Sequence, residues 1–277
     1  MFSLQSFAKL NLGLDVIKKR DDGFHDISSI MCKINLCDQI YFQESNKNEV
    51  FQEGITMEKN IVFKVLDYMT KEYSPSKKLK IIIEKKIPYS SGMGGGSSNA
   101  ATAIQGINKL LKLNLDSKEK FDIGLKFGSD IPFFLSNSSA LISGRGDKIQ
   151  FIKNPNIQDL IIIYPFYQIE DKTKKVFEKI NKLSSTENQL DLLKEINSGV
   201  QLEGPFYNSL EEPAMEVFYN LESIKHKIED VTSKKLSMSG AGPTLYFVEN
   251  SQNDRLEIIN EIKKLNLNIQ LFNVKII

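Results

Sequence analysis

The sequence has few of the residues that mark zinc-binding, secreted or nucleic-acid-binding proteins. It contains only two cysteines, Cys32 and Cys37, and two histidines, His25 and His226, which lie far apart in the chain. We therefore expect no zinc site, and a reducing cytoplasm as the compartment. The formal net charge is +1 over 277 residues, so no global field attracts nucleic acid or an anionic membrane.

Long apolar runs are also missing. No stretch approaches the roughly 18 apolar residues that a membrane-spanning helix needs, and Gln5, Lys9 and Asn11 interrupt the apolar N-terminus. We expect neither membrane insertion nor export. The hydrophobic content of 41% is ordinary for a soluble globular protein, and the chain shows no internal repeat or low-complexity linker.

The most informative segment is glycine-rich and reads PYSSGMGGGSSNAA over residues 88–101. Its four glycines can adopt positive φ and allow the backbone to lie against a ligand. Ser97 and Ser98 follow as candidate N-caps of a helix whose apolar residues recur with helical period up to Leu111. Residues 79–87 alternate in polarity like a half-buried strand. A strand, a glycine loop and a helix N-terminus together predict a phosphate site.

Two common phosphate loops do not fit this segment. Asn99 stands where a GxxxxGK[ST] motif could place its lysine, and the glycine spacing differs from GxGxxG. The alternative is a flexible glycine turn, which we favour less because turns seldom need three consecutive glycines before a helix.

Two further segments supply candidate groups for catalysis. From Ala8 to Val16 the even positions are apolar, so Lys9 and Asn11 point together away from the core side. The alternative, an exposed edge-strand face, is equally compatible with the pattern. Asp130, between a glycine and a proline, is the best carboxylate to accept a proton in phosphoryl transfer, although it suits a turn equally well. A neighbouring lysine such as Lys9 would keep that carboxylate ionised.

The remaining patterns predict a mixture of strands and helices without a strict βαβ alternation, which indicates an α+β fold. A polar stretch at residues 151–159 is a plausible seam between two parts. The predicted strands cover residues 8–16, 30–42, 78–87, 140–142, 160–164, 235–238, 244–249 and 269–276. The predicted helices cover residues 60–72, 100–111, 116–128, 173–183, 215–228 and 254–265.

Five segments together resemble the GHMP kinases, a family of small-molecule kinases. They are AKLNLGL (8–14), KRDDGFHDI (19–27), PYSSGMGGGSSNAA (88–101), GSDIPFFL (128–135) and MSGAGPTLYF (238–247). The resemblance implies a two-lobed GHMP-kinase-like fold of the α+β class. Residues 1–153 would form a lobe like domain 2 of ribosomal protein S5, with the phosphate loop, Lys9 and Asp130. Residues 154–277 would form a ferredoxin-like lobe that completes the substrate site.

By this resemblance Asp130 is the catalytic base and Lys9 its partner. The ATP-binding residues would be Pro88, Ser90, Ser91, Gly92, Met93, Gly94, Gly95, Gly96, Ser97, Ser98 and Asn99. Mg²⁺ would accompany ATP, with Ser98 and the phosphates as its ligands, since Asn99 stands where the family often has aspartate. The substrate-binding residues would be Asn11, Phe24, His25, Phe177, Ser239, Gly240 and Gly242.

Within the family, the match is to kinases whose alcohol substrate carries a cytidine diphosphate group in the non-mevalonate isoprenoid pathway. Phe24 would stack on the cytosine, His25 would hydrogen-bond its edge and Phe177 would close the other face. Alternatively, Phe24 is a hydrophobic plug, His25 a turn residue and Phe177 a core residue.

The expected activity is ATP-dependent phosphorylation of a C2 hydroxyl of this substrate by a cytoplasmic monomer or weak homodimer, without nucleic-acid or membrane partners. Two other functions remain open. One is a mevalonate or homoserine kinase of the same family, and the other is a nucleotide-binding regulator that has lost catalysis.

Overall fold

The computed structural model describes the backbone of residues 1–277 and the side chains of all of them except 252 and 253. The strands are β1 (Phe2–Lys19), β2 (His25–Ser45), β3 (Glu49–Gln52), β4 (Lys78–Glu84), β5 (Ser139–Gly144), β6 (Lys148–Ile152), β7 (Leu160–Pro165), β8 (Ser237–Met238), β9 (Leu245–Val248) and β10 (Ile269–Val274). The α-helices are α1 (Ile61–Tyr73), α2 (Gly95–Leu111), α3 (Ser117–Phe127), α4 (Ile131–Phe134), α5 (Lys172–Glu178), α6 (Glu187–Ser198), α7 (Glu211–Val217), α8 (Leu221–Thr232) and α9 (Gln252–Lys264), and a 3₁₀ turn covers Met57–Lys59. This mixture confirms the predicted α+β class.

Elements with clear local signals form as predicted. Helix α1 begins after Asn60, whose side-chain oxygen accepts a hydrogen bond of 2.9 Å from the Val62 amide. The capping box predicted at α3 is present, with reciprocal bonds of 2.8 Å between Asp116 and Glu119. These bonds satisfy amide groups that the helix itself leaves unpaired.

Two predictions in the C-terminal half are wrong in detail, and one helix was missed. The helix predicted over residues 215–228 is two helices, α7 and α8, because Asn220 adopts a left-handed φ of 63° that interrupts the helical path. Helix α5 ends at Glu178 rather than near Leu183. Helix α6 was not predicted, and it buries Leu192 and Ile196 on one face.

The chain divides into two compact units, which interleave along the sequence. Unit 1 comprises Met1–Ala8, Leu36–Tyr89 and Gly94–Asn137, and unit 2 comprises Lys9–Asn35, Ser90–Met93 and Ser138–Ile277. The predicted lobes, 1–153 and 154–277, are a different division and stay a prediction.

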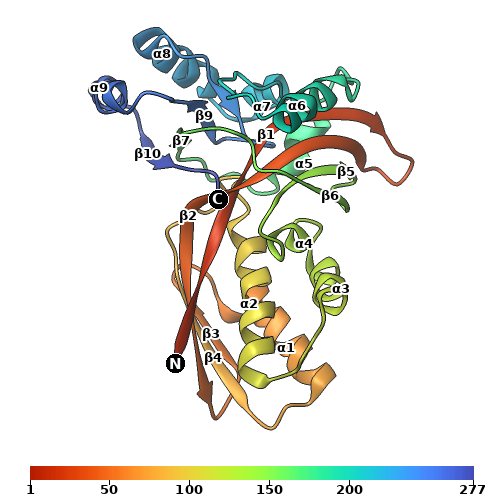
Figure 1. The fold of residues 1–277 in the computed structure, drawn as a ribbon. Helices are drawn as coiled ribbons and strands as arrows, with labels where there is room; N and C mark the ends of the chain where they lie inside the picture. Colours follow the sequence, from red (N-terminus) through yellow and green to blue (C-terminus); the bar gives the residue numbers. More distant parts are fainter. The chain divides into compact units, whose positions relative to one another are not determined.

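In unit 1, β4 pairs with β3 in parallel and with residues 39–45 of β2 in antiparallel register. Helices α1 and α2 lie beside each other along these strands (Figure 1). A Cβ atom on Gly106 of α2 would lie 2.2 Å from the ring of Phe42 in β2. Only glycine therefore lets α2 approach the sheet this closely, and this packing positions the start of the helix.

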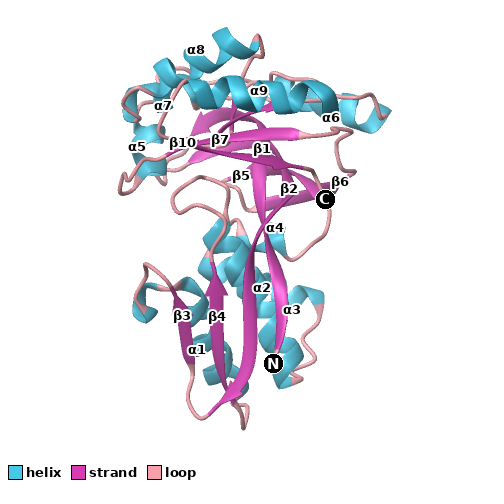
Figure 2. Ribbon diagram, turned by 90° about the vertical axis from the view of Figure 1, so that its left-hand side faces the viewer, coloured by secondary structure: helices cyan, strands magenta, loops and turns pink.

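In unit 2, an antiparallel sheet has the strand order β10-β7-β9-β8. Helices α7, α8 and α9 lie along one side of β7 and β10 (Figure 2). Ile161, Ile163 and Phe247 from the sheet pack against Phe218 and Ile228 from the helices and the segment between them. The first part of β2, residues 27–31, pairs with β5, which in turn pairs with β6.

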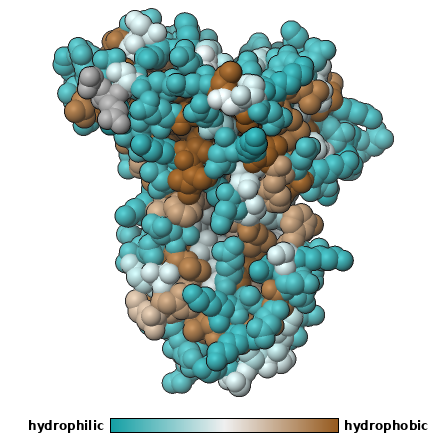
Figure 3. Space-filling model, in the orientation of Figure 1, coloured by the Kyte–Doolittle hydropathy of each residue, from teal (hydrophilic) through white to brown (hydrophobic). Residues whose placement is uncertain are grey.

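Hydrophilic residues cover most of the face drawn in Figure 3, with smaller hydrophobic areas among them. Among the residues described, no helix is long and apolar enough to cross a membrane.

Candidate active site

The helix that follows the glycine segment begins earlier than predicted. Gly94, not Ser97 or Ser98, occupies the N-cap position with a left-handed φ of 69°, and Gly95 is the first helical residue. The Ser98 amide donates to the Gly94 carbonyl over 2.9 Å, so Ser98 already belongs to the helix. The prediction of a serine cap is wrong because a glycine makes the turn that a side-chain cap would otherwise stabilise. The expected phosphate contact at the N-terminus of α2 is unaffected by this change.

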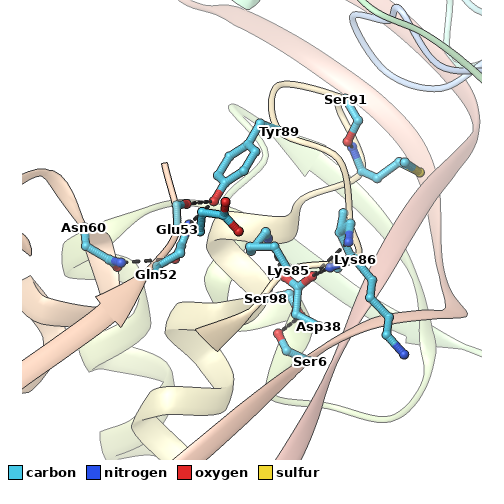
Figure 4. A network of polar contacts seen from close by, with 12 residues as sticks. Ser6, Asp38, Gln52, Glu53, Asn60, Lys85, Lys86, Tyr89, Ser91 and Ser98 are labelled. Carbon is cyan, nitrogen blue, oxygen red and sulfur yellow. Dashed lines mark hydrogen bonds and ion pairs between the residues drawn. The ribbon is translucent and has the colours of Figure 1, made fainter. Parts of the chain in front are cut away.

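Two polar residues in the first turns of α2 were candidates for the Mg²⁺ and ATP site. The Ser98 hydroxyl shares a hydrogen bond of 2.7 Å with the Ser6 hydroxyl (Figure 4). The Asn99 side-chain oxygen is buried and has no hydrogen-bond partner among the residues that the structure describes. A buried oxygen acceptor without a partner suits a hard cation such as Mg²⁺, so these residues fit the expected ion.

Asp38, which the sequence analysis did not single out, organises the end of β4. Its carboxylate is fully buried, pairs with the Lys85 ammonium and accepts hydrogen bonds of 2.8 Å from the Lys86 and Ile87 amides (Figure 4). The Lys85 ammonium also lies 3.1 Å from where a Cβ on Gly95 would sit. The ion pair of Lys85 and Asp38 therefore stands beside the start of α2, with its ammonium towards Gly95.

In unit 2, the first part of the glycine segment packs against the loop after β8. Gly92 has a φ of +83°, and a Cβ on it would lie 2.8 Å from the Gly242 carbonyl oxygen. The Thr244 hydroxyl donates to the Ser91 carbonyl over 2.7 Å. Two glycine-rich segments about 150 residues apart in the sequence thus touch through their backbones.

Lys9 and Asn11 lie together on β1, as predicted, but on a buried face. Their exposed fractions are 6% and 3%, so the alternative of an exposed edge strand is wrong. The Lys9 ammonium donates to the Asn11 side-chain oxygen, the Asn11 amide nitrogen donates to the Ser29 hydroxyl over 2.8 Å, and the Asn11 backbone amide donates to the Ser239 hydroxyl over 3.0 Å. These contacts hold the lysine at a fixed position.

A second asparagine, Asn208, supports the same region and was missed by the sequence analysis. Its side-chain nitrogen donates to the carbonyls of Met238 and Gly240, each over 2.8 Å, and its exposed fraction is 6%. A Cβ on Gly240 would lie 3.0 Å from the Asn11 side-chain oxygen. Asn208 therefore holds the loop that contains Ser239, Gly240 and Gly242 against Asn11.

The predicted cytosine-binding residues share one cavity of about 950 Å³ in unit 2. The His25 and Phe177 rings are 5.1 Å apart between centroids and tilted by 37°. Phe24 is 58% exposed, and the Arg145 guanidinium carbon lies 5.3 Å from its ring centroid. An exposed side chain is not a hydrophobic plug, so that alternative for Phe24 is wrong. Phe177 lines the cavity and also packs against the core, so it has the position of a cytosine-binding residue and of a core residue.

The electrostatics of this cavity favour a neutral imidazole. Burial, and secondarily the charge of Lys19, lowers the pKa of His25 below its ordinary value. A neutral histidine can both donate and accept a hydrogen bond, which suits the polar edge of a base.

The cavity also contains Lys172, which the sequence analysis missed. Its ammonium donates to the Gly242 carbonyl, and burial, with a smaller contribution from Lys9, lowers its pKa to about 7. Its position on α5, five residues before Phe177, is the only sequence signal that could have singled it out.

Asp130 immediately precedes α4 in unit 1. Its carboxylate makes no capping hydrogen bond to that helix, and its residue is half-buried. Pro132 in the first turn removes one amide that a cap would otherwise serve. Asp130 thus stands at a turn before α4, as the turn-forming alternative expects. Its carboxylate does not cap this helix.

Comparison with known proteins places this chain among kinases of small molecules. Residues 60–138 match the model of the GHMP kinases N terminal domain. A solved structure titled 4-(cytidine 5'-diphospho)-2C-methyl-D-erythritol kinase shares the fold with a TM-score of 0.82, at 22% identity and with 99% of each chain covered. A homoserine kinase from Cytophaga hutchinsonii gives a TM-score of 0.69 at 17% identity, covering 99% of this chain and 95% of the other. The predicted GHMP-kinase fold is therefore confirmed.

Curated relatives narrow the class to one family. The 4-diphosphocytidyl-2-C-methyl-D-erythritol kinase of Thermodesulfovibrio yellowstonii is 34% identical over 266 residues, covering 92% of both chains. The enzyme of that name from Fusobacterium nucleatum is 34% identical over 269 residues, covering 92% of this chain and 91% of its own length. The chain belongs to the family of 4-diphosphocytidyl-2-C-methyl-D-erythritol kinases, and it is an ATP-dependent phosphotransferase.

Proposed function

We propose that the chain transfers the γ-phosphoryl group of ATP to the C2 hydroxyl of 4-diphosphocytidyl-2-C-methyl-D-erythritol. The observation that carries this proposal is the cavity that contains Phe24, His25 and Phe177, since a pyrimidine needs a flat apolar surface and a hydrogen-bonding edge. The names of the curated relatives support the same substrate. Mevalonate and homoserine have no base for these side chains to recognise.

In the proposed reaction, the Asp130 carboxylate accepts the proton of the substrate hydroxyl. The resulting oxygen attacks the γ-phosphorus of ATP, the bond from that phosphorus to the bridging oxygen of ADP breaks, and ADP leaves with the electron pair. Lys9 offsets the negative charge, and its hydrogen bond to Asn11 holds its ammonium for that role. Positioning and charge stabilisation then provide most of the catalysis.

ATP would bind through its phosphates to the glycine segment. The positive φ values of Gly92 and Gly94 let the backbone turn towards the phosphates, and the α2 N-terminus offers free amide groups. The remaining proposed contacts are Pro88, Ser90, Ser91, Met93, Gly95, Gly96, Ser97, Ser98 and Asn99. Mg²⁺ would be held by the ATP phosphates with Ser98 or the Asn99 side-chain oxygen, and it would neutralise charge on the transferring group.

The alcohol substrate would lie against Asn11 and the loop that contains Ser239, Gly240 and Gly242, with its cytosine at Phe24, His25 and Phe177. Asn208 supports this arrangement by holding the loop through two carbonyls. Binding energy from the remote cytidine would then orient the reacting hydroxyl.

We further propose a cytoplasmic enzyme that is a monomer or weak homodimer. The buried Cys32 and the partly exposed Cys37 are both free thiols, as suits a reducing compartment. Size-exclusion chromatography with light scattering over a range of concentrations tests the oligomeric state.

A coupled ADP-release assay tests the function. The panel comprises 4-diphosphocytidyl-2-C-methyl-D-erythritol, the methylerythritol without the nucleotide, mevalonate and homoserine, each with ATP and Mg²⁺. We expect the cytidine compound to give by far the highest kcat/KM, and CMP to compete with the alcohol rather than with ATP. Faster turnover of mevalonate or homoserine would overturn the substrate assignment, and no ADP release with any alcohol would favour a regulator that has lost catalysis.

A further inference from the structure

The Lys172 ammonium lies where two glycine backbones meet. It donates a hydrogen bond to the Gly242 carbonyl, and it would lie 3.3 Å from a Cβ on Gly92. Each glycine belongs to one of the two segments that touch in unit 2. A side chain at Gly92 would occupy space beside the amine, whereas a Cβ on Gly242 would meet Met238 and Phe218 instead. The absence of a side chain at Gly92 therefore leaves the amine open on that side.

Lys172 is also one of the residues that line the cavity with His25 and Phe177. Lys172 and Phe177 are five residues apart on α5, about 7.5 Å along a helix axis at 1.5 Å per residue. The two residues therefore line the cavity from separate places along one helix. A ligand with an aromatic end and a charged end can reach both.

The cavity lining has as many carboxylates as lysine and arginine side chains, but the charged neighbour that acts on the Lys172 amine is another cation. Lys9 is a second cation near Lys172, and together with burial it disfavours the charged form of the amine. An ammonium has three donors, and one is used on Gly242. A phosphate would accept the remaining hydrogen bonds and would stabilise both lysines as cations.

We propose that Lys172, which lines this cavity and donates to the Gly242 carbonyl, binds a phosphate group of a ligand in the cavity. The inference rests on the proposed function, which supplies two sources of that chemistry. One is the diphosphate of the cytidine-linked substrate, and the other is the terminal phosphate of ATP. The alternative is that Lys172 only ties α5 to the Gly242 carbonyl.

Calorimetric titrations with cytidine, CDP and ATP separate these possibilities. They are made on the parent protein and on the variants Lys172→Met, Lys172→Arg and Lys175→Met. Lys175 is the matched control, because it is an exposed lysine on the same helix and does not line the cavity. Cytidine reports whether the cavity is intact, since it has the base but no phosphate.

We expect the parent to bind CDP more tightly than cytidine. Lys172→Met should weaken CDP binding by roughly 10- to 100-fold, the range for a hydrogen bond between charged groups, and leave cytidine binding unchanged. Lys172→Arg should recover part of the loss, and Lys175→Met should bind like the parent. A loss confined to ATP would support the phosphate contact and identify ATP as its source.

Unchanged affinity of Lys172→Met for both CDP and ATP would overturn the proposal. Equal weakening of cytidine and CDP would also overturn it, because it would show that Lys172 only maintains the cavity. If the parent binds neither cytidine nor CDP, the proposed substrate is wrong, and the ATP titrations still decide whether Lys172 contacts a phosphate.

Discussion

Replacing Gly92 with alanine tests the contact between the two glycine segments. Gly92 has a φ of +83°, and the new Cβ would lie 2.8 Å from the Gly242 carbonyl oxygen, a backbone atom that cannot rotate away. The left-handed conformation alone costs a non-glycine residue about 1–2 kcal/mol. Displacing a packed neighbour adds about 1–3 kcal/mol, so we expect a total loss of about 2–5 kcal/mol in the free energy of unfolding.

Gly199 provides a matched control for the backbone conformation alone. Its φ is +78°, and a Cβ placed on it meets no atom within 4 Å. Gly199→Ala should therefore cost only the conformational part, about 1–2 kcal/mol. Both glycines belong to unit 2, so equilibrium urea denaturation followed by circular dichroism compares them in the same part of the chain.

Activity gives a second measurement of the same contact. A displaced Gly242 loop would move Lys172 and the neighbouring Ser239, and a misplacement of about 1 Å costs roughly 10²-fold in kcat/KM. Gly199→Ala should leave kcat/KM unchanged. The reasoning would be refuted by a Gly92→Ala protein that is as stable as Gly199→Ala and fully active.

Three further predictions concern catalysis, substrate recognition and pH. Asp130→Asn should lower kcat by roughly 10²–10⁴-fold, which is the contribution of a general base. The affinity for ATP, measured by calorimetry, should change little. Near-normal turnover of this variant would mean that another residue is the base. His25→Ala should raise the KM for the cytidine substrate by the equivalent of about 1–3 kcal/mol without changing the KM for ATP. Phe24→Leu should change the KM for the cytidine substrate in the same direction. A rise in the KM for ATP alone would contradict both predictions. Burial lowers the pKa of Lys172 from 10.5 to about 7. Between these pH values the unfolded chain therefore holds more protons than the folded one. The free energy of unfolding should then rise with pH from about 7 to 10.5. Lys172→Met should reduce that rise, measured by urea denaturation from pH 7 to pH 10, and an unchanged slope would show that this amine does not titrate as described.

Features set by neighbouring residues could be predicted from the sequence. The capping box at Asp116 and Glu119, the alternation along β4 and the start of α1 after Asn60 all form where they were expected. Their hydrogen bonds and side-chain directions depend on residues within about four positions, so the sequence pattern contains the whole interaction. The family likewise followed from short motifs read in order along the chain.

The helix boundaries that the sequence misplaced depend on single backbone conformations. The helix over residues 215–228 has a continuous apolar pattern, yet Asn220 takes a left-handed φ and divides it. Gly94 similarly replaces the two serines that looked like caps. Composition permits several conformations at such positions, and packing of the flanking segments selects one.

The details of the site were decided by tertiary structure. The sequence could place Lys9 and Asn11 on one face of a strand, but not decide that this face is buried beneath Ser239, which lies 228 positions from Asn11. Lys172 is one of several lysines in its segment, and its burial and its contact with Gly242 distinguish it. The sequence thus determined the α+β class, the family and the motifs, because those depend on local patterns. The burial of Lys9, the contact of the two glycine segments and the place of Lys172 depend on contacts between distant residues, and those exist only once the chain has folded.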